Sequence, residues 1–441
     1  MKNSIKELKL QRAKGTRDLT PTIMIMRQKI IKTLQEIFET YGYNPLETPI
    51  IERYDLFASK FSQGNESDAM KETFKLVDQG KRMLVLRNEF TVPLGRFVGM
   101  NPNLKMPFKR YQMGPVFRDG PIKFGRYREF WQCDVDIIGA KSMLADAEII
   151  QITQRIFNRL NIDVEIRINN RKILNSILNL ANISDDLNNS VIITIDKLDR
   201  IGLNGIKQEL LDKGIRTASV NKILNIIKIS GNNKEKVKQL ENILGKNTGI
   251  EEIKRTMNYL IDQRNIILSP FMVRGLAYYT GNIFEVYSKN DKLSSSLAGG
   301  GRYDKMISGF LQNKKGYPAV GIAFGLERIF DVMSLDPKKT KNSIVEVFII
   351  PIGEETTKEA FYMVSQLRDS GINADIDLLN RSLTKNLKYV NELNIKYVLF
   401  IGEEEIKMSA VCLKNMETGE QTEIKKNELI NKLKQLIDKK I

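Results

Sequence analysis

Basic side chains cluster around a loop rich in glycine and proline within the segment 107–139. Both ends of this segment alternate apolar and polar residues, as half-buried strands do, so the pattern predicts a β-hairpin. Four basic residues surround the loop and an aromatic ring follows it: Arg118, Lys123, Arg126, Arg128 and Phe130. Guanidinium groups pair well with phosphates and a flat ring can stack on a base, so the hairpin could bind a nucleotide. A basic surface hairpin without a ligand fits the spacing equally well.

The chain contains no histidine, and this limits its chemistry. It excludes a Ser–His or Cys–His nucleophile, a histidine general base and a histidine-ligated zinc ion. Catalysis must therefore use arginines, carboxylates, backbone amides or a bound metal. Nucleotidyl transfer, which depends on positioning and charge, is compatible with those groups.

A carboxylate and a hydroxyl follow a buried strand predicted at 83–87. Glu89 and Thr91 come just after its apolar run, where they could face an amine of a ligand. The alternative is a helix that starts here, because the helix dipole favours an acidic residue in the first turn. The residues alone favour the helix start.

Two later segments also contain candidate ligand-binding residues. The segment 273–281 places an arginine before a pair of tyrosines, which by default would pack in a core: Arg274, Tyr278 and Tyr279. The segment 319–328 is an apolar strand that runs into a helix. Arg328 falls in the first turn of that helix, beside backbone amides that favour anions.

These segments together resemble the class II aminoacyl-tRNA synthetases, and specifically the histidyl-tRNA synthetase family. The run GRYREF at 125–130, followed by Gln132 and Asp136, resembles motif 2 of that class. A long helix followed by a strand at 48–51 that contains Pro49 resembles motif 1, which forms the dimer interface in the family.

The remaining motifs also match, with two departures. The segments 273–281 and 298–304 resemble the histidine-specific motifs RGLDYYTG and AGGRYD, and 319–328 resembles motif 3. Residue 277 is Ala277 where the family has aspartate, and Gly120 stands where many class II enzymes carry glutamate. The glycines at 299–301 do not fit a dinucleotide-binding loop, and we expect them to let the backbone approach the bound amino acid closely.

The resemblance implies a role for each candidate residue. The catalytic candidates hold the α- and γ-phosphates of ATP: Arg118, Arg274 and Arg328. The ATP-binding candidates are Arg118, Arg126, Phe130 and Arg328. The histidine-binding candidates are Glu89, Thr91, Gln132, Asp136, Arg274, Tyr278 and Tyr279. No protein ligand for a metal is implied, and Mg²⁺ would be held mainly through the phosphates of ATP.

Asp136 and Tyr279 match the family's contacts to the imidazole ring. At neutral pH one ring nitrogen donates and the other accepts, so a carboxylate could take one and a hydroxyl the other. The alternative is that Asp136 pairs with a neighbouring arginine and that Tyr279 packs in the core.

The implied activity is that of a histidine–tRNA ligase, which activates histidine with ATP and transfers it to the 3′ end of tRNA(His). The resemblance also implies a homodimer. A regulatory paralogue that binds histidine and controls ATP phosphoribosyltransferase is an alternative. It usually lacks the catalytic arginines and the C-terminal domain that this chain has. A synthetase for threonine, proline or glycine is disfavoured by the two histidine-specific motifs.

The expected fold class is α+β, with a class II catalytic domain of an antiparallel sheet flanked by helices. We expect this domain at 1–180 and 263–335, a helical insertion domain at 181–262, a linker at 336–343 and an anticodon-binding α/β domain at 344–441. The last domain alternates strands and helices, which predicts a mixed, largely parallel sheet.

Composition is consistent with a cytoplasmic protein that has a polyanionic partner. No apolar run is long enough to span a membrane, and the two cysteines form no CxxC pair. The formal net charge is +16, while 181–262 and 344–441 are each nearly balanced. The excess positive charge therefore lies with the hairpin, which favours a nucleic-acid or nucleotide partner there.

Overall fold

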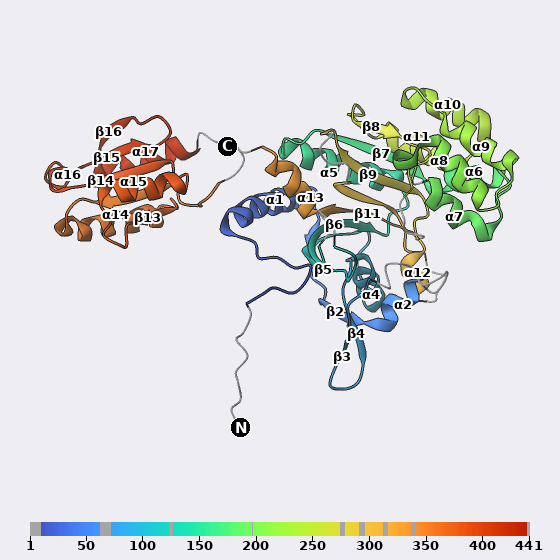
Figure 1. The fold of residues 1–441 in the computed structure, drawn as a ribbon, viewed down its shortest axis with the longest axis horizontal. Coiled ribbons are helices and arrows are strands. Elements are labelled where there is room, and N and C mark those ends of the chain that lie inside the picture. The colour runs from blue at the N-terminus through green and yellow to red at the C-terminus, as the bar shows by residue number, and fades with distance from the viewer. Residues whose placement is uncertain are drawn as a thin grey trace. The chain divides into compact units, whose positions relative to one another are not determined.

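The structure is a computed structural model of the 441-residue chain. It describes residues 10–61, 72–122, 127–195, 197–273, 278–290, 296–311, 316–336 and 341–438. The chain divides into two compact units (Figure 1). One comprises residues 1–17 and 30–335, and the other comprises residues 18–29 and 336–441. None of the described helices is long and apolar enough to cross a membrane.

The larger unit is built on an eight-stranded sheet. In spatial order its strands are β1 (Asn44–Pro45), β5 (Phe108–Phe117), β6 (Glu129–Ile138), β11 (Ala319–Gly325), β10 (Ala298–Arg302), β9 (Asn282–Ser288), β7 (Val164–Asn170) and β8 (Ile266–Leu268). The six strands from β5 to β7 are antiparallel to their neighbours, and the short edge strands β1 and β8 pair in parallel. The predicted antiparallel sheet is confirmed.

One face of this sheet is apolar. Its aromatic residues contact helices α1 (Pro21–Thr40) and α5 (Met143–Arg159). The ring of Phe38 lies 5.5 Å from that of Tyr111 and 6.0 Å from that of Phe324, and Phe157 of α5 lies 6.0 Å from Phe324. Because side chains alternate along a strand, the polar residues between these positions point to the opposite face.

A second, three-stranded sheet consists of β2 (Ile51–Arg53), β4 (Met83–Leu86) and β3 (Lys75–Val77), in that order. The strand expected at 48–51 therefore begins later, at Ile51. Pro49 has no N–H to donate to a strand neighbour, and the side chain of Thr48 is instead hydrogen bonded to that of Gln112. Helices α2 (Tyr54–Phe61), α4 (Thr91–Met100) and α12 (Met306–Phe310) pack together beside these strands.

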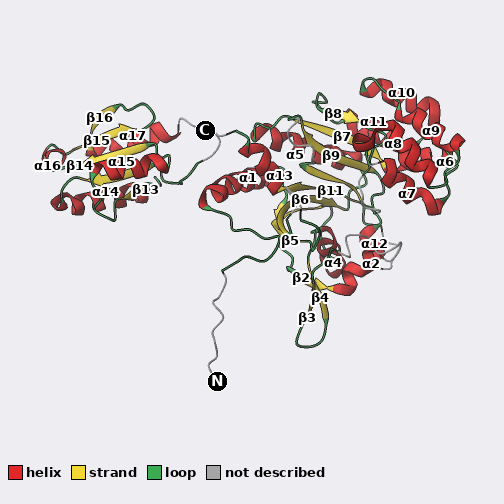
Figure 2. Cartoon of the chain, viewed as in Figure 1, coloured by secondary structure: helices red, strands yellow, loops and turns green. Residues whose placement is uncertain are grey.

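The segment 181–262 consists of helices joined by turns and loops, with no strand among its described residues (Figure 2). It contains α7 (Asp185–Ile195), α8 (Leu198–Asp212), α9 (Thr217–Ile227), α10 (Asn233–Leu244) and α11 (Thr248–Asn258), and follows α6 (Arg171–Leu180). The helix α11 packs against α5, α6 and β7, so the segment is in contact with the sheet. Its separation as an insertion domain remains a prediction.

The smaller unit has a five-stranded sheet in the order β13 (Ala374–Ile376), β12 (Val347–Pro351), β14 (Tyr397–Ile401), β15 (Ala410–Asn415) and β16 (Gln421–Lys425). Only the first two pairings are parallel, and the last two are antiparallel. The expected mixed sheet is therefore confirmed, while the expectation that it is largely parallel is wrong. The short connection between β15 and β16, at 416–420, can join only antiparallel neighbours.

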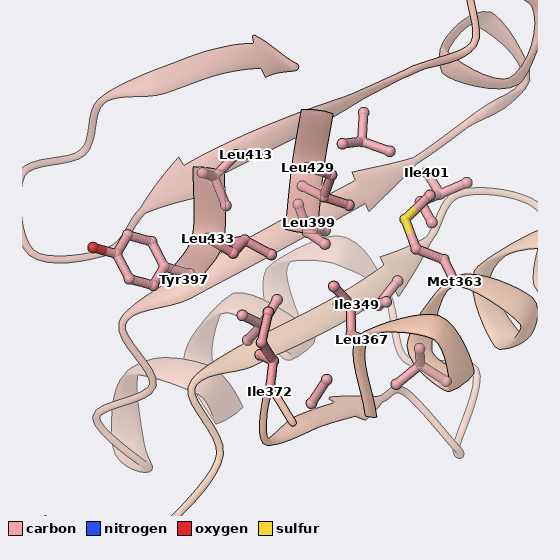
Figure 3. Close-up of a cluster of buried hydrophobic side chains, with 14 of the residues drawn as sticks. Ile349, Met363, Leu367, Ile372, Tyr397, Leu399, Ile401, Leu413, Leu429 and Leu433 are labelled. Carbon is pink, nitrogen blue, oxygen red and sulfur yellow. The ribbon is translucent and has the colours of Figure 1, made fainter. Parts of the chain in front are cut away.

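Helices cover both faces of this smaller sheet. Helices α14 (Thr357–Asp369) and α17 (Lys426–Asp438) pack on one face, where Leu367, Leu399 and Leu433 are buried (Figure 3). Helix α15 (Leu383–Glu392) packs on the other face around Phe348 and Val390. The remaining helices are the short η2 (Glu354–Thr356) and α16 (Glu403–Lys407). The unit thus has its own apolar core.

Candidate active site

The polar face of the eight-stranded sheet brings the candidate residues of the hairpin together. In the register of β5 and β6, Arg110 lies opposite Asp136, Gln112 opposite Asp134, and Gly114 opposite Gln132. These six positions share one face because side chains alternate along each strand. The predicted hairpin is confirmed, and its polar residues point away from α1 and α5.

A buried ion pair lies at the centre of this face. Nη2 of Arg110 is 2.7 Å from Oδ2 of Asp136, and both side chains are almost completely buried. The hydroxyl of Tyr303 donates to the other carboxylate oxygen of Asp136. Burial raises the pKa of Asp136, and the positive charge of Arg110 acts in the opposite direction. The contact of Asp136 with a neighbouring arginine, considered above as the alternative to an imidazole contact, is thus present.

Two glycines leave room for the side chains of Asp136 and Tyr279. A Cβ atom on Gly321 of β11 would lie 1.9 Å from Oδ1 of Asp136. A Cβ atom on Gly301 of β10 would lie 2.9 Å from the ring of Tyr279 and 2.6 Å from the carbonyl oxygen of Asn282. Any larger residue at either position would push the acidic or aromatic group out of place. The groups that come close to these two glycines, and that therefore require them, belong to the protein itself.

Three tyrosines pack together, and one of them, Tyr303, contacts Asp136. The rings of Tyr278 and Tyr279 are 4.7 Å apart, and the ring of Tyr278 meets that of Tyr303 edge-on at 6.0 Å. Tyr279 and Tyr303 are buried. The predicted histidine-binding tyrosines thus lie with Tyr303, which hydrogen bonds to Asp136.

Glu89 lies at the N-terminus of helix α4. Its carboxylate accepts hydrogen bonds from the backbone N–H of Thr91 at 3.1 Å and of Val92 at 2.8 Å. These two groups are among the first amides of a helix, which have no partner within it. A helix does start in this segment, as the alternative interpretation expected, but Glu89 precedes its first turn, which begins at Thr91.

Arg118 and Phe130 are also in contact. The guanidinium carbon of Arg118 lies 4.9 Å from the centre of the Phe130 ring, and its Nε donates to the carbonyl oxygen of Asn88 at 3.2 Å. The basic and aromatic groups of the predicted nucleotide site are thus adjacent. Because Arg118 covers one face of the ring, a stacked base would occupy the other face.

Arg328 is exposed in the first turn of α13 (Leu326–Ser334), as predicted. Its Nη1 donates to the carbonyl oxygen of Ser296 at 2.6 Å. The neighbouring Glu327 is buried and accepts from the backbone N–H of Trp131, which connects α13 to β6. Arg126 and Arg274, like Ala277, lie outside the described residues.

The candidate residues omit two that the structure places at the centre of the site. Arg110 lies on the strand face opposite to Tyr111, and only the register of β5 with β6 brings it to Asp136. Tyr303 belongs to the AGGGRYD segment, which was a signal for its presence. Arg302 of the same segment has a structural role, because it is buried and pairs with Asp146 at the start of α5.

Comparison with known proteins gives a consistent result. Residues 15–329 match the family model described as histidyl-tRNA synthetase, and residues 346–436 match an anticodon binding domain. The chain is 40% identical to a histidine–tRNA ligase of Bacillus anthracis, over 97% of this chain and all of that protein.

Solved structures also resemble this chain. A histidyl-tRNA synthetase from Nostoc sp. PCC 7120 superimposes with a TM-score of 0.85 at 29% identity, covering 97% of this chain and all of that one. A Bacillus halodurans protein described as an ATP phosphoribosyltransferase regulatory subunit/histidyl-tRNA synthetase has a TM-score of 0.73 at 20% identity, covering 90% and 99%. The second likeness concerns the fold alone.

Proposed function

Because the chain belongs to the histidyl-tRNA synthetase family and ligates histidine to tRNA, we propose that it activates histidine on the polar face of β5, β6 and β11. The observation that carries this placement is the convergence of separate segments on one buried group. Asp136 of β6 meets Arg110 of β5 and Tyr303, which follows β10. Tyr278, just before β9, contacts Tyr303.

The reaction has two steps. A carboxylate oxygen of histidine attacks the α-phosphorus of ATP, the bond from that phosphorus to the bridging oxygen breaks, and pyrophosphate leaves. A ribose hydroxyl at the 3′ end of tRNA(His) then attacks the activated carbonyl carbon, and AMP leaves. Neither step requires a nucleophile from the protein, so orientation and charge stabilisation supply the catalysis.

The arginines act on the phosphates. Arg118 and Arg274 flank the α-phosphate, where negative charge develops as the new bond forms, and Arg328 holds the γ-phosphate. Arg126 lies near the nucleotide, and the base stacks on Phe130. Support comes from the contact of Arg118 with Phe130 and from the exposed position of Arg328 at a helix N-terminus.

The histidine substrate lies along β6 in this proposal. Glu89, Thr91 and Gln132 hold its amino-acid end, while Asp136, Tyr278 and Tyr279 line the pocket for the imidazole ring. Asp136 is already oriented by Arg110 and Tyr303, which is the kind of preorganisation that a specific site needs.

Magnesium enters the proposal only through the nucleotide. Bound to ATP, Mg²⁺ would neutralise part of the phosphate charge. The described residues contain no group of three or more cysteine or acidic side chains placed to hold a metal ion by themselves.

The smaller unit supplies the tRNA contact. Residues 346–436 match an anticodon binding domain, so we assign 344–441 to anticodon recognition, after a linker at 336–343. We assign 1–180 and 263–335 to catalysis, with 181–262 as a helical insertion. We also propose a cytoplasmic homodimer. Ile50 and Ile51, which follow Pro49, are apolar and exposed, and they support an interface at this position. Sedimentation that shows a fully active monomer would contradict the dimer.

ATP–pyrophosphate exchange measured with each of the twenty amino acids tests the proposal. We expect exchange with histidine alone, followed by charging of tRNA(His) with the same preparation. Exchange with threonine, proline or glycine would assign a different synthetase activity. Histidine binding without any exchange would match the regulatory paralogue and overturn the proposed activity.

A further inference from the structure

Asp134 occupies the middle of the polar face. On β6 it lies between Gln132 and Asp136, and it shares their face because they are two residues away on either side. Its side chain is 4% exposed. Its neighbours across the sheet are Gln112 on β5 and Ala323 on β11.

Apart from Oδ2 of Asp136, which lies in the ion pair with Arg110, two acceptor atoms on this face have no hydrogen bond within the described part of the chain. They are Oδ1 of Asp134 and Oε1 of Gln132, and both are buried; Nε and Nη1 of Arg110 on the same face are also buried without a hydrogen bond. The amide of Gln112, which faces Asp134, donates instead to the hydroxyl of Thr48 at 3.0 Å. Buried acceptors without partners are costly and uncommon in native proteins. A ligand with several N–H donors would satisfy both atoms.

With Asp134 itself counted, carboxyl groups outnumber basic groups around this position. Arg110 and Arg118 lie near its carboxylate together with two acidic groups, Asp136 and Glu89. Arg110 lies in direct contact with Asp136, and Arg118 contacts Phe130. Burial raises the pKa of Asp134 well above its ordinary value, which agrees with a carboxylate whose charge is incompletely matched.

We propose that Asp134 is a further substrate-binding residue, and that its carboxylate accepts a hydrogen bond from the α-ammonium group of histidine. The inference rests on the proposed function, which makes histidine the substrate. An ammonium group has three N–H donors, and Gln132 and Glu89 would accept the other two. The imidazole ring would then extend along β6 to Asp136, about 7 Å further along the strand.

The test compares two ligands that differ only in the amino group. Histidinol carries it, and 3-(imidazol-4-yl)propan-1-ol lacks it. Calorimetric titration of Asp134→Asn should show roughly ten- to hundredfold weaker binding of histidinol, since a hydrogen bond between charged groups is lost. Binding of the amine-free alcohol and of ATP should change by less than about threefold.

Matched variants separate binding from folding. Asp262→Asn removes a half-exposed carboxylate that pairs with Arg264, and it should leave both titrations unchanged. Asp134→Ser should reproduce the selective loss, and circular dichroism melts should show that both Asp134 variants are folded.

Other outcomes overturn the assignment. Unchanged histidinol binding in folded Asp134 variants would exclude the contact. Equal losses of affinity for both ligands would show that Asp134 contacts the imidazole ring or shapes the pocket, and that it does not bind the amine. If the unaltered protein bound neither ligand, the proposed function itself would fail.

Discussion

The guanidinium group of Arg110 lies 2.7 Å from the carboxylate of Asp136, directly across the β5–β6 pair. Both groups are almost completely buried, and Tyr303 donates a hydrogen bond to the same carboxylate. Asp136 is therefore oriented by the protein before any ligand arrives. Such a buried pair is sensitive to the loss of either partner, because the remaining charge is left without compensation.

We expect Arg110→Met to lower the free energy of unfolding by about 3–5 kcal/mol, since it leaves the Asp136 carboxylate buried and unpaired. Urea denaturation of the variant measures this change. The double variant Arg110→Met/Asp136→Leu should regain much of the loss, because it removes both charges. A single variant as stable as the unaltered protein would show that the pair contributes little.

Asp136→Asn should raise the KM for histidine roughly a hundredfold and leave the KM for ATP almost unchanged. The variant keeps the size of the side chain but removes the charge that would accept an imidazole N–H. Tyr279→Phe should act in the same direction more mildly, because a neutral hydrogen bond is lost. Pyrophosphate-exchange kinetics measure both constants, and equal effects on histidine and ATP would contradict the imidazole assignment.

Glu89 should show two separable roles. Glu89→Gln keeps an oxygen that can accept from the amides of Thr91 and Val92 but loses the charge. We therefore expect a small change in stability and a clear loss of histidine affinity. Glu89→Ala also removes the acceptor for these amides, and loss of such an acceptor at a helix N-terminus typically costs about 0.5–2 kcal/mol. Thermal melts and histidine titrations distinguish these effects, and normal histidine binding in Glu89→Gln would leave only the structural role.

Arg274→Ala should abolish adenylate formation while histidine and ATP still bind. The chain has no histidine to act as a general base, so charge stabilisation must dominate the chemical step. Loss of one such donor typically reduces the rate about a hundred- to a thousandfold. Exchange kinetics combined with equilibrium binding test this expectation, and near-normal exchange would assign Arg274 another role.

Asp134 should make the ligand-free protein less stable as pH rises. Arg110, Asp136, Glu89 and Arg118 surround this carboxyl group, and burial raises its pKa in the folded state above the ordinary value of about 3.9. The folded state therefore holds the proton more tightly than the unfolded state. Its stabilising contribution is complete below about pH 4 and is lost as pH rises through the folded pKa.

The measurement is the difference in melting temperature between Asp134→Asn and the unaltered protein, without ligand. The difference should move in favour of the variant as pH rises above about 4, because the variant has no proton to lose. A difference that stays constant over this range would show that Asp134 titrates normally.

Local features of the site follow directly from the sequence. The alternation over 107–139 determines a hairpin and the sharing of one face by Gln132, Asp134 and Asp136, because side-chain direction along a strand has a period of two. The placement of Arg328 in the first turn of a helix is equally local. The motifs that resemble the synthetase family are likewise visible in the sequence alone.

Tertiary structure decided which of these groups meet. Arg110 reaches Asp136 only because of the register between β5 and β6, and Tyr303 joins them from more than 160 residues further along the chain. The glycines at 301 and 321 are required by side chains from other segments, which no local pattern reveals. Glu89 accepts hydrogen bonds from two backbone amides because α4 starts two residues later. Contacts between distant segments depend on packing and register, and these are properties of the folded chain as a whole.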